Sequence, residues 1–498
     1  MNIASNYVAH TIYLALILIF GLFFDQMGFK FFAILALAMS LGLMAFLPNK
    51  VSIYILLAFI SFQGFLKVIS NYHPAIHLGA DLVVIGLLAK IVIQASINGI
   101  PKDFKLPPLT VFFLIHFAWV FICYFNPYSL GIIPSIAGSK VYISMFMLFF
   151  FGYYLTDNTE DIKKYFLFFI ALAVIHTVFS IYQGLNGPSS VLSLHPRYAV
   201  QLEKYQDTAF RPFGLTNLPG APAVYIYTSL PFVFYFMYFS KSLLVKLLCF
   251  AFLPFTGLSI LLCQVRSAIV KAIAALSIFV LGIITSRYPF TAVKRTQTLI
   301  LSAAMSLLLI SIFPVLMTMS TDSYQDNTRA FERSMTSFNV EIMSHARRGA
   351  WERFKKYSSE VPFGAGFSRV GASAGAFKSY QSKDQFFGQK YFFADNLFIT
   401  LLVETGIPGL IFVTLLVLAV LQKGLKAWRN EERKELIGLQ LAITGSLFAI
   451  FIGSFGAEGI IYNPESCFFW FFGGTLIKSL DPKFGLFSGK KHVPEQSL

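Results

Sequence analysis

The chain has 498 residues, of which 56% are hydrophobic and only 13% are charged. Soluble globular proteins carry about 25% charged residues, so this composition excludes a soluble protein and indicates an integral membrane protein. The formal net charge of +15 suggests an anionic partner, but the positive residues lie in short loops between apolar runs, which argues against nucleic acid as that partner.

Apolar runs long enough to cross a bilayer recur along the chain. A membrane-spanning helix needs about 20 mostly apolar residues. The sequence therefore predicts an all-α polytopic membrane protein with about 14 transmembrane helices. Their centres lie near residues 16, 38, 58, 84, 116, 146, 173, 230, 255, 276, 307, 408, 446 and 471. The first run lacks a basic flank and a small-residue cleavage site, so we expect a retained helix and not a signal peptide.

Lys and Arg residues are distributed unequally between the loops. If both termini face the cytoplasm, the short inner segments hold about three times as many of them as the short outer loops. Because cytoplasmic loops are enriched in Lys and Arg, we expect this orientation. Residues 184–220 and 319–394 then form two outer loops, the second of about 75 residues.

The predicted spans divide the chain into four parts. Residues 1–318 hold the first eleven spans, residues 319–394 form the large periplasmic or extracellular loop, residues 395–479 hold the last three spans, and residues 480–498 form a cytoplasmic tail. Within the large loop, residues 335–361 have helical periodicity with an apolar stripe that includes Trp351 and Phe354. The glycine-rich "PFGAGFSRVGASAGAF" follows, a composition that favours turns and close approach of the backbone to a ligand.

Ionisable side chains within or at the ends of predicted spans are candidates for function, because a charge at the bilayer centre costs about 2.5 to 3.5 kcal/mol. They are Asp81, Lys90, Lys140, Lys271, Asp395 and Glu404. Lys90 is expected to reach water at an inner end. Asp395 opens a span, where an ordinary N-cap is the alternative to a functional role. In "ETGIPG", Pro408 has no amide to donate to the carbonyl of Glu404, which predicts a kink in the helix. We expect Glu404 to satisfy polar groups freed at this kink or polar groups in a neighbouring span.

Several cations are expected in the outer third of the membrane. They are Lys140, Arg211, Arg266, Lys271, Arg347 and Arg348. Together they predict a positive outer cavity that suits a diphosphate, because guanidinium groups bind phosphate through paired planar donors and stay charged. For any single member, a structural ion pair or a contact with a lipid headgroup is the alternative.

Motifs between about residues 130 and 420 resemble those of the O-antigen ligase/polymerase superfamily of bacterial membrane glycosyltransferases. In chain order they are "RPFGLTNLPGAPA" from Arg211, "QVRSAIVKAIAAL" from Gln264, Arg347 with Trp351, "PFGAG" at 362–366, Asp395 with Asn396, and "LLVETGIPGL" at 401–410. Asp395 stands where ligases usually have His. In this respect the chain looks more like polymerases of O-antigen, capsule or exopolysaccharide repeat units.

The resemblance implies transfer of a glycan from an undecaprenyl-diphosphate-linked donor to a sugar hydroxyl, on the outer side of the bacterial inner membrane. It implies inversion at the sugar carbon and needs no metal, cofactor or nucleotide sugar. Asp395 would take the hydroxyl proton, while Arg266 and Arg347 would stabilise the departing diphosphate. The expected substrate-binding residues are Lys140, Arg211, Lys271, Arg348, Trp351 and Asn396. The lipid bilayer and a chain-length regulator are the other candidate partners.

Three alternatives to a polymerase remain open at this point. A ligase would use the same chemistry to move glycan onto lipid A core or a protein. A lipid-linked oligosaccharide flippase or other transporter would also have many spans, but such proteins often show related halves, which the sequence does not. A cell-wall polymerase of the shape and division family is also a multi-span enzyme with an essential outer acid.

Overall fold

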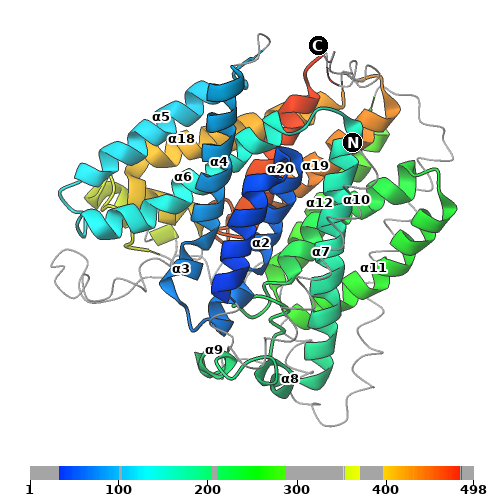
Figure 1. Ribbon diagram of the computed structural model, residues 1–498, viewed down its shortest axis with the longest axis horizontal. Coiled ribbons are helices and arrows are strands. Elements are labelled where there is room, and N and C mark those ends of the chain that lie inside the picture. Colours follow the sequence, from blue (N-terminus) through cyan, green and yellow to red (C-terminus); the bar gives the residue numbers. More distant parts are fainter. Residues whose placement is uncertain are drawn as a thin grey trace, which may run out of the picture.

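The computed structural model describes residues 33–99, 104–204, 210–286, 351–352, 354–370, 396–429, 431–482 and 484. Across these residues the chain is helical and contains no β-strand, as the sequence predicted. Long helices pack into a bundle (Figure 1). Helices are expected here because every backbone polar group inside a bilayer must find its partner within the protein.

Eight helices in the described part of the chain are long and apolar enough to cross a membrane. They are α2 (Asn49–Ile69), α4 (Gly79–Asn98), α6 (Ile132–Tyr154), α7 (Thr159–Asn186), α11 (Leu243–Cys263), α12 (Arg266–Thr285), α18 (Leu397–Ala427) and α19 (Lys434–Gly453). Shorter apolar helices are Ala33–Phe46, α5 (Thr110–Ile122) with η1 (Cys123–Phe125), and α10 (Ala223–Phe239). A further short helix is α20 (Glu465–Ser479). Predicted centres 16 and 307 lie outside the described residues, and every other centre falls within one of these helices, so the count of about fourteen is not confirmed.

The core of the bundle is built where α6 crosses α20. A Cβ atom on Gly152 of α6 would overlap the backbone carbonyl of Phe471, and one on Gly474 of α20 would overlap the carbonyl of Phe149. Small residues at a crossing let two helix backbones approach closely, which is how helices pack when lipid is the solvent. Aromatic rings fill the space beside this crossing, including Phe146 and Trp470 at 4.1 Å between ring centroids.

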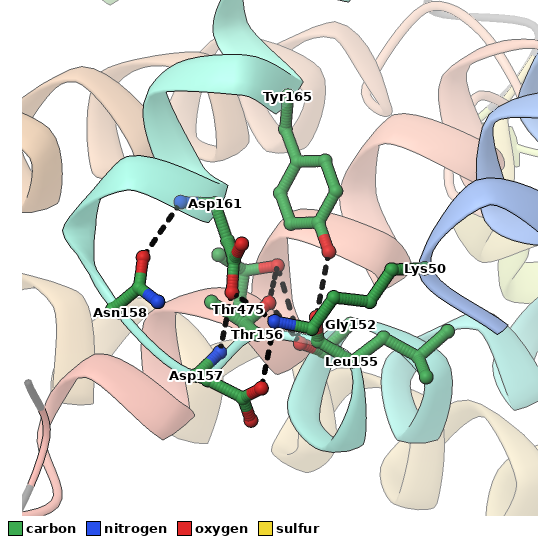
Figure 2. Close-up of polar contacts among 9 residues, drawn as sticks. All are labelled: Lys50, Gly152, Leu155, Thr156, Asp157, Asn158, Asp161, Tyr165 and Thr475. Atoms are coloured by element: carbon green, nitrogen blue, oxygen red, sulfur yellow. Dashed lines mark hydrogen bonds and ion pairs between the residues drawn. The ribbon is translucent and has the colours of Figure 1, made fainter. Parts of the chain in front are cut away.

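One end of the bundle, the predicted inner end, is held by paired charges. Figure 2 shows Lys50, at the start of α2, between Asp157 and Asp161, with its Nζ 2.6 Å from a carboxylate oxygen of each. Asn158 caps α7 by accepting from the amide of Asp161, and Tyr165 donates to the carbonyl of Leu155 at 2.8 Å. These contacts join the start of α2 to the connection between α6 and α7.

The opposite end, the predicted outer end, carries the longer connections. It includes the short helices α3 (Pro74–His77), α8 (Pro188–Leu192) and α9 (Tyr198–Lys204), the last two at the lower edge of Figure 1. The connection between α7 and α10 folds back onto the bundle, because Gln183 of α7 accepts from the amides of Phe213 and Gly214 at 2.8 and 2.7 Å. Residues 210–222 are thereby fixed against the helices.

Candidate functional site

Helix α18 is broken in the middle of the "ETGIPG" sequence. Gly406 has φ 72° and ψ −174°, outside the helical region, and Pro408 follows two residues later. Glycine adopts positive φ without steric cost, and proline has no amide to donate into the preceding turn. The kink predicted from the sequence is therefore confirmed, and its sharpest point is Gly406.

Residues 361–370, which include "PFGAG", lie across this break and bond its freed backbone groups. The amide of Ala365 donates to the carbonyl of Val403 at 2.6 Å, and the amide of Ile407 donates to the carbonyl of Pro362 at 2.8 Å. The backbones of Gly364 and Gly406 approach so closely that a Cβ on either would overlap the other's backbone. The glycines of both motifs thus let one loop complete the hydrogen bonding of a broken helix.

Two side chains from the end of α5 and its following turn complete the same contact. Trp119 donates through Nε1 to the carbonyl of Thr405 at 2.8 Å, and Asn126 donates to the carbonyl of Gly364 at 2.8 Å. The loop 361–370 is consequently held between α18 on one side and the α5–α6 connection on the other. We call this arrangement, residues 361–370 with 403–407, the loop socket.

Glu404 lies at the centre of the loop socket and is fully buried. The hydroxyl of Tyr142 on α6 donates to its Oε2 at 2.7 Å, and the amide of Val370 donates to its Oε1 at 3.4 Å. The carboxylate therefore accepts hydrogen bonds both from a neighbouring span and from the loop. This agrees with the sequence interpretation, in which Glu404 satisfies polar groups near the kink or in an adjacent helix.

The N-terminus of α18 is capped by Asn396. The Oδ1 atom of Asn396 accepts from the amides of Phe398 and Ile399 at 2.9 and 3.2 Å. Its amide group donates to the carbonyl of Phe455 in the connection between α19 and α20. Asp395 lies outside the described residues, so the role that the sequence left open for it stays a prediction.

Two arginine-bearing motifs that lie far apart in sequence meet at the predicted outer end. Gln264, two residues before Arg266, donates to the carbonyl of Phe210, the residue before Arg211, at 3.0 Å. Gly220 packs so tightly on the same α11–α12 turn that a Cβ would meet Val265 and, at 3.0 Å, the carbonyl of Cys263. The segment that carries Arg211 is therefore fastened to the turn from which α12 begins with Arg266.

The two lysines expected in the positive cavity are both paired with carboxylates. Lys140 lies 3.0 Å from Asp81, and Lys271 lies 2.5 Å from Glu465. The hydroxyl of Ser144 also donates to Asp81 at 2.6 Å. For these two residues the structure shows the ion-pair alternative that the sequence left open.

Other predicted residues are only partly described. Arg347, Arg348 and Asp395 lie outside the described residues, as does the side chain of Arg266. Trp351 is 48% exposed and stands edge-on to Phe354, with 5.6 Å between ring centroids.

Lys90 has a structural role that the sequence did not assign. It donates to the carbonyls of Met44 and Leu47 and thereby closes the end of the helix Ala33–Phe46.

Arg369 is an outer cation that sequence reasoning missed. It lies in the loop 361–370, where it donates to the carbonyl of Ala365 at 2.7 Å and to the carbonyl of Tyr128. Burial lowers the pKa of Arg369 to about 10, because the charged form loses hydration. The sequence clue was its place in the glycine-rich segment, five residues after Gly364.

Two acidic residues near the end of the chain were also missed. Thr400 donates to Glu458, and Glu465 is the first residue of α20 and the partner of Lys271. Both acids lie in "GAEGIIYNPES", between the last two predicted spans. Carboxylates at the edges of apolar runs were the available clue, but their partners depend on helix packing.

Comparison with protein families agrees with these motifs. A family model described as O-antigen ligase matches residues 249–414. This range contains most of α11, the start of α12 at Arg266, "PFGAG" and the break in α18, whereas Arg211 and the α19–α20 connection lie outside it. A search of curated proteins found no match.

The match confirms the family resemblance that the motifs gave, and it indicates a multi-pass membrane enzyme of the glycosyltransferase type. The segment 249–414 is therefore similar to the O-antigen ligase family, which belongs to the superfamily that the motifs resemble.

Proposed function

We propose that the protein is a polysaccharide polymerase. Its donor is a glycan linked to undecaprenyl diphosphate, and its acceptor is a hydroxyl of a second sugar chain, both presented at the outer face of the inner membrane. In the reaction, the acceptor oxygen forms a bond to the anomeric carbon as the bond from that carbon to the diphosphate oxygen breaks. The configuration inverts, the acceptor hydroxyl gives up its proton, and the lipid diphosphate leaves as an anion.

The observation that carries this proposal is the junction between the two arginine motifs. The loop of Arg211 is fastened to the turn before Arg266 through Gln264 and Gly220. Two guanidinium groups from one fixed junction suit a diphosphate, since each offers paired donors and neither loses its charge. As the leaving group departs, its growing charge is stabilised by cations that are already in position.

Asp395 is the proposed general base. It accepts the proton of the acceptor hydroxyl, so that attack and deprotonation occur together. The capping of α18 by Asn396 supports this assignment, because the helix start is complete without a carboxylate from Asp395. Arg347 is proposed to act beside Arg266 on the diphosphate, with Arg348, Trp351 and Asn396 lining the substrate.

The test is to replace the two arginines in turn. We expect Arg211→Ala and Arg266→Ala each to lower the rate of chain extension by about a hundredfold or more, the usual effect of removing one group that stabilises a developing anion. Rates are measured with purified protein and a lipid-linked repeat unit. Arg197→Ala is the matched control, because Arg197 lies in the same connection as Arg211 and its Nε donates to Asn71 at 2.6 Å. Wild-type rates of chain extension in both test variants would exclude a diphosphate site at this junction.

A ligase is the second candidate, because the matching family model is described as O-antigen ligase. The two activities leave different glycans when the protein is absent. A strain without the polymerase accumulates single lipid-linked repeat units, whereas a strain without the ligase accumulates full-length lipid-linked chains. Accumulation of full-length chains would replace the polymerase proposal with the ligase.

A further inference from the structure

Lys271 and Glu465 form an ion pair inside the bundle that the reaction above does not use. The Nζ atom of Lys271 lies 2.5 Å from Oε1 of Glu465 and 3.1 Å from the hydroxyl of Tyr227. The same atom lies over the aromatic ring of Tyr227, 4.8 Å from the ring centroid. The two charged side chains are only 4% and 8% exposed. The pair thus connects three helices: α10, α12 and α20.

The surrounding backbone is shaped to hold this pair. At Gly453, the last residue of α19, a Cβ would overlap the end of the Lys271 side chain. At Gly459, in the connection to α20, a Cβ would overlap the carboxylate of Glu465. The pair therefore occupies space that two glycines leave open.

The energetics of such a pair favour a positioning role over a stabilising one. Burying two charges costs about as much hydration free energy as their attraction returns, so apolar residues of similar volume often stabilise a protein equally well. What an ion pair does provide is one defined register between the elements it joins. Glu465 is also the first residue of α20, where the helix dipole favours a negative charge and fixes its place.

The position of Lys271 along α12 connects this register to the outer end. Arg266 is the first residue of α12, and Lys271 follows five residues later, which is about 7.5 Å along the helix axis. A shift or rotation of α12 at Lys271 is carried to Arg266, because a helix of this length moves as a rigid rod. Tyr227 on α10 and Glu465 on α20 both contact Lys271, so two neighbouring helices hold α12 in place.

We propose that Lys271 and Glu465 are positioning residues that fix the height and rotation of α12 and thereby hold Arg266 where the donor diphosphate binds. This inference rests on the proposed function and extends it to two residues, one of which lies outside the segment that matches the family model. Neither residue needs to touch the substrate.

The test replaces the ion pair with apolar side chains of similar size, Lys271→Met together with Glu465→Leu. Because the burial cost disappears with the attraction, we expect the double variant to fold and to unfold at nearly the wild-type temperature. We expect kcat/KM for the lipid-linked donor to fall between about tenfold and a hundredfold, mainly through KM, since a 1 Å misplacement of a binding group costs about a hundredfold. The KM for the acceptor should stay unchanged.

The matched control is Lys163→Met with Glu435→Leu, another Lys–Glu pair between two helices, α7 and α19, at the predicted inner end. Its donor KM should equal that of the wild type. If the Lys271→Met, Glu465→Leu variant has wild-type donor KM, the positioning role is excluded. If that variant does not fold, Glu465→Asp decides: it keeps the charge but shortens the side chain by one methylene, so a raised donor KM supports the role and an unchanged one excludes it.

Arg266→Ala distinguishes failure of the positioning role from failure of the proposed diphosphate site. If Arg266→Ala lowers kcat/KM for the donor and the double variant does not, only the positioning role fails. If Arg266→Ala leaves kcat/KM for the donor unchanged, the diphosphate site itself is wrong.

Discussion

The cations at the two ends of the bundle have different contact partners. At the predicted inner end, charged side chains meet carboxylates: Lys50 contacts Asp157 and Asp161, Lys163 contacts Glu160 and Glu435, and Arg433 contacts Glu431. At the predicted outer end, two arginines in connecting segments contact neutral oxygens. Arg197 donates to the side-chain carbonyl of Asn71, and Arg369 donates to the backbone carbonyls of Ala365 and Tyr128.

This difference has an electrostatic consequence. A cation paired with a carboxylate has little field beyond the pair, whereas a cation held by carbonyl groups keeps its full charge. Fixed charge in a site with little water attracts an anion far more strongly than the same charge in bulk solvent. The ion pairs of the inner end thus join helices, and the cations proposed to act on an anionic ligand are Arg211 and Arg266 at the outer end. Lys140 and Lys271, which are paired, belong with the joining contacts although they lie towards the outer end.

Among tests of this comparison, we expect the largest effect from substitution of Asp395, which should lower turnover. If the outer end carries the chemistry, Asp395→Asn should lower turnover by about a hundredfold to ten-thousandfold, the usual contribution of a general base. Binding of the donor should persist, because the arginines are unchanged. Turnover is measured by incorporation of labelled repeat units into polymer. A rate near that of the wild type would assign proton transfer to another group.

Removal of the Glu404 side chain should cause the next largest effect, on stability. Glu404→Ala removes the acceptor of the buried Tyr142 hydroxyl, and a buried polar group left unsatisfied costs about 1 to 3 kcal/mol. We expect a clear fall in unfolding temperature in detergent. Tyr142→Phe is the control, since it removes one donor and should cost less. Equal stability of Glu404→Ala and the wild type would mean that the loop socket does not depend on this carboxylate.

Loss of the cap on α18 should have a smaller effect. Asn396→Ala removes the acceptor for two amides at the start of α18, and such a change typically costs about 1 kcal/mol. Thermal unfolding of the purified variant measures it. Asn396→Asp serves as the control, because aspartate is also a good N-cap and should keep the stability. A cost equal to that of Glu404→Ala would show that Asn396 does more than cap the helix.

The smallest effect is expected at the inner end. Lys50 and Asp157 are 43% and 61% exposed, so water and salt weaken their attraction. A double-mutant cycle with Lys50→Ala and Asp157→Asn should give a coupling of about 1 kcal/mol or less, decreasing with salt, and chain extension should be unaffected. A large loss of activity from Lys50→Ala would contradict the assignment of the reaction to the outer end, because the inner end would then take part in it.

The sequence alone determined the class of the protein and the local features of its helices. Apolar length predicts a helical membrane protein, and the missing amide of Pro408 predicts the kink in α18, because both depend only on neighbouring residues. The motif order likewise led to the family that the segment 249–414 matches. The predicted orientation, the fourteen spans and the roles of Asp395, Arg347 and Arg348 remain predictions.

Only the tertiary structure decided which residues meet. Tyr142 and Glu404 are 262 positions apart, Lys271 and Glu465 are 194 apart, and Phe210 and Gln264 are 54 apart. Periodicity and apolar length carry no information about such pairs, because the partner of a buried charge is set by how the helices rotate and pack against one another. For this reason Lys271 was predicted to bind substrate, while the folded bundle supplies Glu465 as its partner.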